Sequence, residues 1–118
     1  MASYRDLLAW QKSMELITQI YQVSKKFPSE ELFGMVSQMR RAAVSIPSNI
    51  AEGQGRLTKG EFIQFLGIAR GSLLELETQI LVAQNLNYLD EPTLKNLLEL
   101  TSEVGRLVNG LLGAIKKR

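Results

Sequence analysis

Hydrophobic residues recur in alternating steps of three and four along four segments of the chain. This spacing places one apolar stripe on one face of an α-helix. The first two stripes consist of Leu7, Trp10, Met14, Ile17 and Tyr21, and of Leu32, Val36, Met39, Ala43, Ile46 and Ile50. The third and fourth consist of Phe62, Leu66, Ala69, Leu73, Leu76, Ile80 and Ala83, and of Leu94, Leu97, Thr101, Val104, Val108, Leu111 and Ile115. No segment of useful length alternates between polar and apolar residues with period two, so the pattern predicts four helices and no strand.

Helix start signals stand before three of these segments. Ser29 follows a proline and precedes two glutamates, which predicts an N-cap for the second helix. Thr58 and Glu61 have the spacing of a capping box for the third helix. Asp90 is placed to cap the fourth, with Pro92 in the first turn. Because the loops are short, we expect consecutive helices to be antiparallel. The sequence therefore predicts one all-α domain over residues 1–118, an up-down-up-down four-helix bundle.

Pro47 lies inside the second helical segment and permits two interpretations. It could end the helix, with Asn49 capping a new one, or it could kink a continuous helix. The apolar stripe keeps one face on both sides of the proline, and a break would usually disturb that phase. We therefore expect a continuous helix, kinked at Pro47, with Gly53 and Gly55 as its stop signals.

A ribbon of polar residues occupies the face of the second helix opposite its apolar stripe. Its members are Arg41, Ser45, Ser48, Asn49 and Glu52, and Arg56 lies at or just past its end. One interpretation is a solvated outer face. However, solvated faces tend to be rich in Lys and Glu, whereas this ribbon uses short Ser and Asn side chains. Short polar side chains allow another backbone to approach closely, so a contact face is the alternative.

Two helices carry more apolar residues than a single stripe requires. The additional residues are Leu16, Ile20, Val23 and Phe27 in the first helix, and Ile63, Leu74 and Leu81 around Arg70 in the third. A broad core face would explain them. The alternative is that they are buried between subunits of an oligomer.

The composition excludes several classes of site. Cysteine and histidine are both absent, which excludes disulfides, Cys or His zinc sites, thiolate nucleophiles and imidazole bases. Fourteen basic and twelve acidic residues leave a net charge of only +2, too small to indicate nucleic-acid binding by itself. We expect no cofactor, metal or small-molecule substrate. With no signal-peptide pattern and no apolar stretch of bilayer length, we expect a soluble, cytoplasmic protein.

Two blocks of the sequence carry a resemblance to a known family. "RRAAVSIPSNIAEGQGR", residues 40–56, followed by "FIQFLGIARGSLLELETQI", is similar to the signature of the bacterial four helix bundle proteins, also called 23S rRNA intervening-sequence proteins. The resemblance extends from about Tyr4 to about Leu112. It implies a four-helix bundle that assembles into a ring-like homopentamer. Some family members are encoded in segments inserted in bacterial large-subunit rRNA genes. A related protein is the accessory subunit of diversity-generating retroelements and binds a reverse transcriptase and nucleic acid.

The resemblance defines no catalytic site, but it suggests which residues matter for assembly. We hypothesise that the motif and assembly residues are Arg41, Ser45, Pro47, Ser48, Asn49, Glu52, Gly53, Arg70, Leu74 and Leu81. The function that we favour is a non-enzymatic oligomeric scaffold or adaptor whose ring docks on a macromolecular partner. In that case Arg41, Asn49 and Glu52 would serve assembly, with Arg–Glu pairing at a subunit contact.

Two other functions follow from the residues. The first is RNA binding through a basic surface, with phosphate contacts from Arg40, Arg41, Arg56, Lys59, Lys116, Lys117 and Arg118. Few aromatic residues are available for stacking on bases, so such binding would recognise the backbone. The second is catalysis, for which Glu52, Glu75 and Glu77 are the only suggestive carboxylates. They have no recognisable catalytic partner, and we do not expect an enzyme.

Overall fold

The computed structural model describes residues 3–118, which form four long helices and three short helical segments. The long helices are α1 (Leu8–Ser24), α2 (Ser37–Gln54), α3 (Lys59–Asn85) and α4 (Glu91–Lys116). The short segments are η1 (Tyr4–Asp6), η2 (Ser29–Glu31) and the π-helical η3 (Leu32–Val36). No residue between 3 and 118 forms a strand, so the predicted all-α fold is confirmed.

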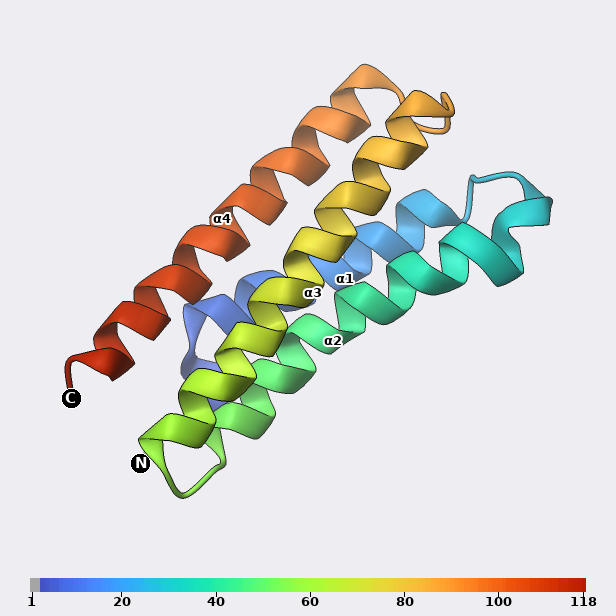
Figure 1. The fold of residues 1–118 in the computed structure, drawn as a ribbon. Coiled ribbons are helices and arrows are strands. Elements are labelled where there is room, and N and C mark those ends of the chain that lie inside the picture. The colour runs from blue at the N-terminus through green and yellow to red at the C-terminus, as the bar shows by residue number, and fades with distance from the viewer. Residues whose placement is uncertain (1–2) are drawn as a thin grey trace.

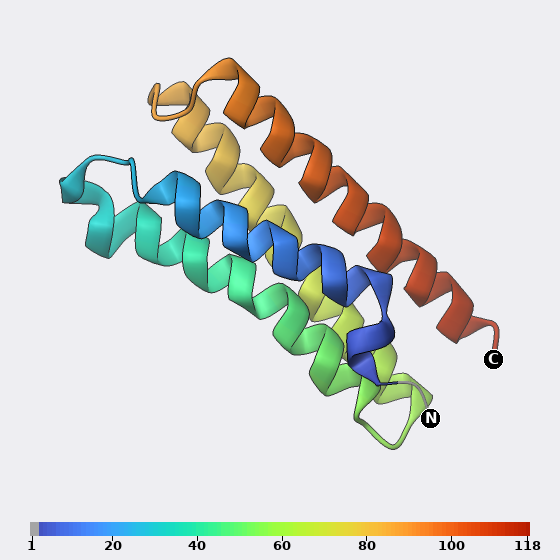
Figure 2. The same ribbon diagram turned by 180° about the vertical axis from the view of Figure 1, so that it is seen from behind.

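The four helices form an elongated bundle with overall dimensions of 45 × 25 × 20 Å. Each helix runs opposite to the one before it in the chain (Figure 1). Helix α1 packs on α2 and α4, and α3 packs on the same two helices. Figures 1 and 2 both place the C-terminus and the α2–α3 loop at one end of the bundle. The η2–η3 segment and the α3–α4 loop lie at the other end.

The predicted stripes of α2, α3 and α4 form most of the core. Every predicted stripe residue of α3, from Phe62 to Ala83, is buried. In α2 the stripe residues from Met39 to Ile50 are buried as well. In α4 only Leu111 is half-buried, and the other members of the stripe are buried. Leu32, the first member of the predicted stripe of the second helix, is exposed in η3 and does not belong to the core.

The core-facing row of α1 is a different one from the predicted stripe. Its buried residues are Ala9, Ser13, Leu16, Ile20 and Ser24. In the predicted stripe, Met14 and Tyr21 are exposed, whereas Leu7, Trp10 and Ile17 are half-buried at the edge of the core. The prediction was wrong because both rows satisfy the helical spacing and two members of the true row are serines. The Ser13 and Ser24 hydroxyls donate to backbone carbonyls of their own helix, so their burial leaves no donor unpaired.

Helix α2 continues through Pro47 without a break, as the phase of its stripe predicts, and Pro47 is buried. The helix ends at Gln54 with Gly55 as its C-cap, so Gly55 is a stop signal as expected. Gly53 has another role, because it is buried inside α2 where the helix meets α3. A Cβ at this position would lie 2.8 Å from Phe65 Cβ and 3.0 Å from Phe62 Cδ1. Glycine therefore allows the close approach of the two helices at this point.

Two of the three predicted N-caps are present. Thr58 Oγ1 accepts a hydrogen bond from the Glu61 backbone N–H, and Asp90 Oδ1 accepts one from the Thr93 N–H. The predicted cap at Ser29 is wrong. Ser29 opens the short η2 segment, and α2 begins only at Ser37, after η3. The backbone leaves helical geometry at Gly34 inside η3, with φ of −113° and ψ of −106°, so the capping signal and the long helix are separated.

We expect Ile46→Asp to destabilise the fold by about 4 kcal/mol, because it places an unpaired charge in the core. Ile46 is fully buried in the present structure. Ser48→Ala, on the exposed side of the same helix, is the matched control and should change stability little. Thermal unfolding followed by circular dichroism measures both. If Ile46→Asp melts at the temperature of the parent, the phase of α2 is wrong.

A second prediction concerns the α2–α3 contact. Gly53→Ala should lower stability by about 2 kcal/mol, because the added methyl group collides with the Phe65 Cβ. Gly110→Ala, in α4, is the control because a Cβ there meets nothing within 4 Å. That substitution should raise stability by roughly 0.5 kcal/mol, since alanine favours a helix over glycine. Equal effects of the two substitutions in urea unfolding would contradict the close approach at Gly53.

Candidate functional site

The polar ribbon of α2 is divided between two environments. On the side facing α3, the Ser45 and Ser72 hydroxyls are hydrogen bonded at 2.8 Å. The Asn49 amide donates to the Ser45 carbonyl at 2.7 Å and to the Ser45 hydroxyl at 3.0 Å. Together with Gly53, these short side chains line the place where α2 and α3 approach each other. On this side, the structure places the short polar residues at a contact between two helices of one chain.

On the outer side of the ribbon, Arg41, Ser48 and Glu52 are exposed. Arg41 and Glu52 make no hydrogen bond or ion pair with any residue of the described chain. They lie on one face of α2 but eleven residues apart in the sequence, which is about 16 Å along a helix. They are therefore too far apart to pair with each other within one chain. Arg41 lines a hollow of about 450 Å³ between α2 and α3, together with Gln38, Ala42, Ser45, Ser72 and Glu75.

Five of the seven predicted phosphate-binding residues gather at one end of the bundle. The Lys59 ammonium group, at the start of α3, donates to the Arg118 carbonyl at 2.7 Å and to the Lys116 carbonyl at 3.5 Å. Arg56, in the preceding loop, holds its guanidinium group 4.6 Å above the centre of the Phe65 ring. The basic end is defined here as Arg56, Lys59, Lys116, Lys117 and Arg118, all of which are exposed.

The other two predicted residues, Arg40 and Arg41, lie near the start of α2, and this end of α2 is at the opposite end of the bundle (Figure 1). Arg40 donates to the Ser24 hydroxyl at 3.0 Å and to the Tyr21 carbonyl at 3.3 Å. Its guanidinium group also stacks 4.5 Å from the centre of the Tyr21 ring. Arg40 thus satisfies a carbonyl near the C-terminus of α1. The structure does not bring these two arginines together with the basic end.

An exposed phenylalanine lies at the end of the bundle opposite the basic end. Phe33, in η3, is 94% exposed. It borders a hollow of about 500 Å³ between α1 and α2, which is also lined by Tyr21, Leu32, Val36, Ser37, Arg40, Arg41 and Val44. Sequence reasoning missed Phe33 because it belongs to no helical stripe. The available signal was a bulky aromatic residue directly before Gly34.

The segment before Phe33 is fastened to the loop between α3 and α4. Tyr88 donates its hydroxyl hydrogen to Glu31 Oε2 at 2.8 Å, and this bond to a carboxylate raises the pKa of Tyr88. The Tyr88 ring also packs on Phe27, with ring centres 5.2 Å apart. These contacts tie the two loops at this end of the bundle to each other.

The additional apolar residues of α3 are mostly at the surface. Leu74 is 55% exposed and Leu81 is 40% exposed, whereas Ile63 is half-buried against the core. Arg70 is exposed as well. Leu74 and Leu81 therefore do not belong to a broadened core face, which was one of the two explanations for them.

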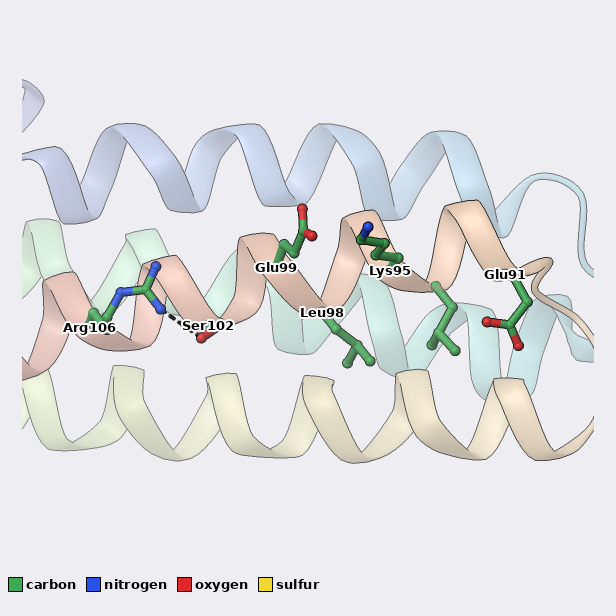
Figure 3. Close-up of a pocket in the computed structure, with 7 residues that line it drawn as sticks. Glu91, Lys95, Leu98, Glu99, Ser102 and Arg106 are labelled. Carbon is green, nitrogen blue, oxygen red and sulfur yellow. Dashed lines mark hydrogen bonds between the residues drawn. The ribbon is translucent and has the colours of Figure 1, made fainter.

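The outer face of α4 carries a hollow of about 580 Å³ lined only by residues of that helix (Figure 3). Charges of both signs alternate along it, and Arg106 donates to the Ser102 hydroxyl at 2.9 Å. The residues labelled in Figure 3 are Glu91, Lys95, Leu98, Glu99, Ser102 and Arg106. The side chains point in different directions and converge on no common point. Nowhere in residues 3–118 do three or more acidic, His or Cys side chains form a group that could hold a metal ion.

No helix within residues 3–118 is both long and apolar enough to cross a membrane.

Ion pairs of Lys12 connect α1 with α4. Lys12 of α1 is paired with Glu15 at 3.1 Å and lies 3.8 Å from Glu103 of α4. These two carboxylates raise the pKa of Lys12, and the arrangement links two helices.

Comparison with known proteins identifies the family. The family model for the 23S rRNA-intervening sequence protein matches residues 5–110. A crystal structure of a protein of unknown function from the S23 ribosomal protein family of Bacteroides thetaiotaomicron superposes with a TM-score of 0.83 and 23% identity. The match covers 90% of this chain and 96% of that one, and it shows a shared fold. No curated protein matches the chain. The chain belongs to the 23S rRNA-intervening sequence protein family.

Proposed function

We propose that the protein is a non-enzymatic scaffold that assembles into a ring-like homo-oligomer, a homopentamer, and docks on a macromolecular partner. The observation that carries the proposal is the exposure of apolar residues along two different helices. Met14 and Tyr21 of α1 are 40% and 38% exposed, and Leu74 and Leu81 of α3 are also at the surface. Large apolar patches on a soluble domain typically mark contact surfaces.

The positions of these patches favour a ring. One patch, Met14 and Tyr21, lies on α1, where Tyr21 lines the hollow between α1 and α2. The other patch, Leu74 and Leu81, lies on α3. When two unlike surfaces of identical chains join, each copy is rotated relative to the one before it. The copies form a closed ring if this rotation is a whole fraction of 360°. The sequence has no histidine or cysteine, and residues 3–118 hold no cluster of three or more acidic side chains, which supports a scaffold over an enzyme.

The proposal predicts a stable oligomer at micromolar concentrations, which light scattering will measure directly. Leu74→Glu and Leu81→Glu should each lower the mass, because they place a charge in an apolar contact while leaving the monomer core intact. Leu57→Glu is the matched control, since Leu57 is fully exposed in the α2–α3 loop, away from both patches. A monomeric parent protein at these concentrations would refute the assembly.

A second candidate function is RNA binding at the basic end. The observation that favours it is the Lys59–Arg118 contact, which brings basic residues of two distant chain segments together. The family is described by an intervening sequence of 23S rRNA, so RNA is a natural partner to test. In a ring, the basic ends of several chains would lie on one rim and reinforce each other's attraction for phosphates.

If the basic end binds RNA, the affinity should fall steeply with salt concentration, because phosphate contacts release counterions. Arg56→Glu with Lys117→Glu should weaken binding by at least tenfold for all RNA sequences, since phosphate contacts do not read bases. Lys95→Glu, on the exposed face of α4, is the control and should bind nearly as the parent does. Anisotropy titrations at several salt concentrations provide the test, with the oligomer mass checked for each variant.

The absence of binding at low salt by an intact oligomer would remove the RNA hypothesis and leave the scaffold. Binding that survives both charge reversals would mean that another surface contacts the RNA.

A further inference from the structure

Two hollows beside η3 join into one groove. The hollow of about 500 Å³ that Phe33 borders has Leu32, Val36 and Arg40 in its lining. A second hollow of about 370 Å³ has the same three residues in its lining and extends to the loop between α1 and η2, where Pro28 lines it. Because they share these residues, the two hollows form one continuous surface, which we call the η3 groove.

The η3 groove exposes apolar side chains that the core of the chain leaves uncovered. Tyr21 of α1, Leu32 and Phe33 of η3, and Val44 of α2 all line it with exposed side chains. Phe33 is the most exposed aromatic residue within residues 3–118. Aromatic and aliphatic residues that gather at an exposed hollow are typical anchors of protein–protein contacts.

All charged residues in the lining of the η3 groove are basic. They are Lys25, Arg40 and Arg41. Arg40 is held by its hydrogen bonds to α1, whereas Lys25 and Arg41 are exposed and have no hydrogen bond or ion pair within residues 3–118. The sequence has 14 basic and 12 acidic residues, so composition alone does not explain a lining without any acidic group. A positive rim around an apolar groove favours an acidic partner.

The chain holds the wall of the groove in a defined position. Glu31, which directly precedes η3, accepts the hydrogen bond of the Tyr88 hydroxyl, and Val36 at the end of η3 is buried in the core. Both ends of the segment that carries Phe33 are therefore fastened. A side chain presented on a fixed backbone loses less conformational entropy on binding than one on a free loop.

We propose that the η3 groove binds an acidic amphipathic helix of a protein partner. Apolar side chains on one face of that helix pack on Phe33 and its apolar neighbours, and its carboxylates face Lys25 and Arg41. The groove follows α2 from Val36 to Val44, which is roughly 12 Å along a helix, so a segment of two to three turns covers it. This inference rests on the proposed scaffold function and names the class of partner that the scaffold docks on.

A second copy of the chain and an anionic membrane fit the groove less well. Glu75 of a second copy already lines a hollow together with Arg41 of its own chain, so it brings no unmatched negative charge. Each copy also has a net charge of +2, which disfavours its approach to a positive rim. A flat anionic membrane would meet Glu30 and Asp90, which are exposed at the same end of the bundle (Figure 1). A narrow acidic helix can enter the groove without approaching them.

The first test is a selection from two displayed libraries of helical peptides about 12 residues long, which is enough to span the groove. Both libraries carry Leu, Ile, Phe or Trp at every third or fourth position. The other positions are Asp, Glu or Ala in one library and Lys, Arg or Ala in the other. The parent protein should enrich peptides from the acidic library and not from the basic one.

The second test is an anisotropy titration with the most enriched acidic peptide. Phe33→Ala and Arg41→Glu should each weaken binding by roughly tenfold, because the first removes the anchor and the second reverses the charge at the rim. Leu57→Ala and Lys95→Glu are the matched controls, since both residues are exposed and lie outside the groove. They should bind as the parent does. Circular dichroism and light scattering verify that each variant keeps its helicity and its mass.

The remaining outcomes assign the groove to another occupant or leave it without one. Equal enrichment from the two libraries, or binding that survives both substitutions, overturns the proposal. A lower oligomer mass of Phe33→Ala would assign the groove to a second copy. Binding of the parent to vesicles of phosphatidylcholine and phosphatidylserine that Phe33→Ala abolishes would assign it to a membrane. Either result overturns the acidic helix as the occupant.

The two proposals fail in different ways. A monomeric parent refutes the proposed assembly, and the peptide titration on that monomer still decides whether the groove binds an acidic helix. An oligomeric parent that binds no acidic peptide overturns the inference about the groove and leaves the scaffold in place.

Discussion

The close approach of α2 and α3 is the constraint on which the rest of the structure depends. Gly53 leaves room for Phe65, and the paired hydroxyls of Ser45 and Ser72 lie between the two helices. Larger side chains at these positions would push the helices apart. Since α2 and α3 also contact α1 and α4, their spacing sets the width of the whole core. The small polar residues of α2 are thus explained in part by packing within the chain.

The same packing decides which apolar residues are left outside. A helix in a four-helix bundle presents one face to the core, and α1 and α3 each have more apolar surface than that face accommodates. In α1 the core takes the row of Leu16 and Ile20, and Tyr21 remains at the surface. In α3 it takes the row of Leu66 and Leu73, and Leu74 remains outside. The proposed assembly therefore depends on a mismatch between apolar surface and core capacity.

The candidate surfaces depend on contacts between residues that are distant in the sequence. The Lys59 ammonium group donates to the Arg118 carbonyl, 59 positions away, and so links the start of α3 to the end of the chain. Tyr88 reaches Glu31 across 57 positions and thereby supports the segment that presents Phe33. The first contact is part of the basic end, and the second supports the segment that carries the exposed Phe33. The basic end and the η2–η3 segment lie at opposite ends of the molecule (Figures 1 and 2).

The sequence by itself determined the helical class, the continuity of α2 through Pro47 and the core faces of three helices. These features follow from local spacing, because a residue's position on a helix is set by its number along the chain. The caps at Thr58 and Asp90 were predictable for the same reason. Only the tertiary structure decided between the two rows of α1, since both have helical spacing and the choice depends on which row α2 and α4 accept. It also separated Arg40 from Arg56 and exposed Phe33, because such placements follow from how helices pack and not from local spacing.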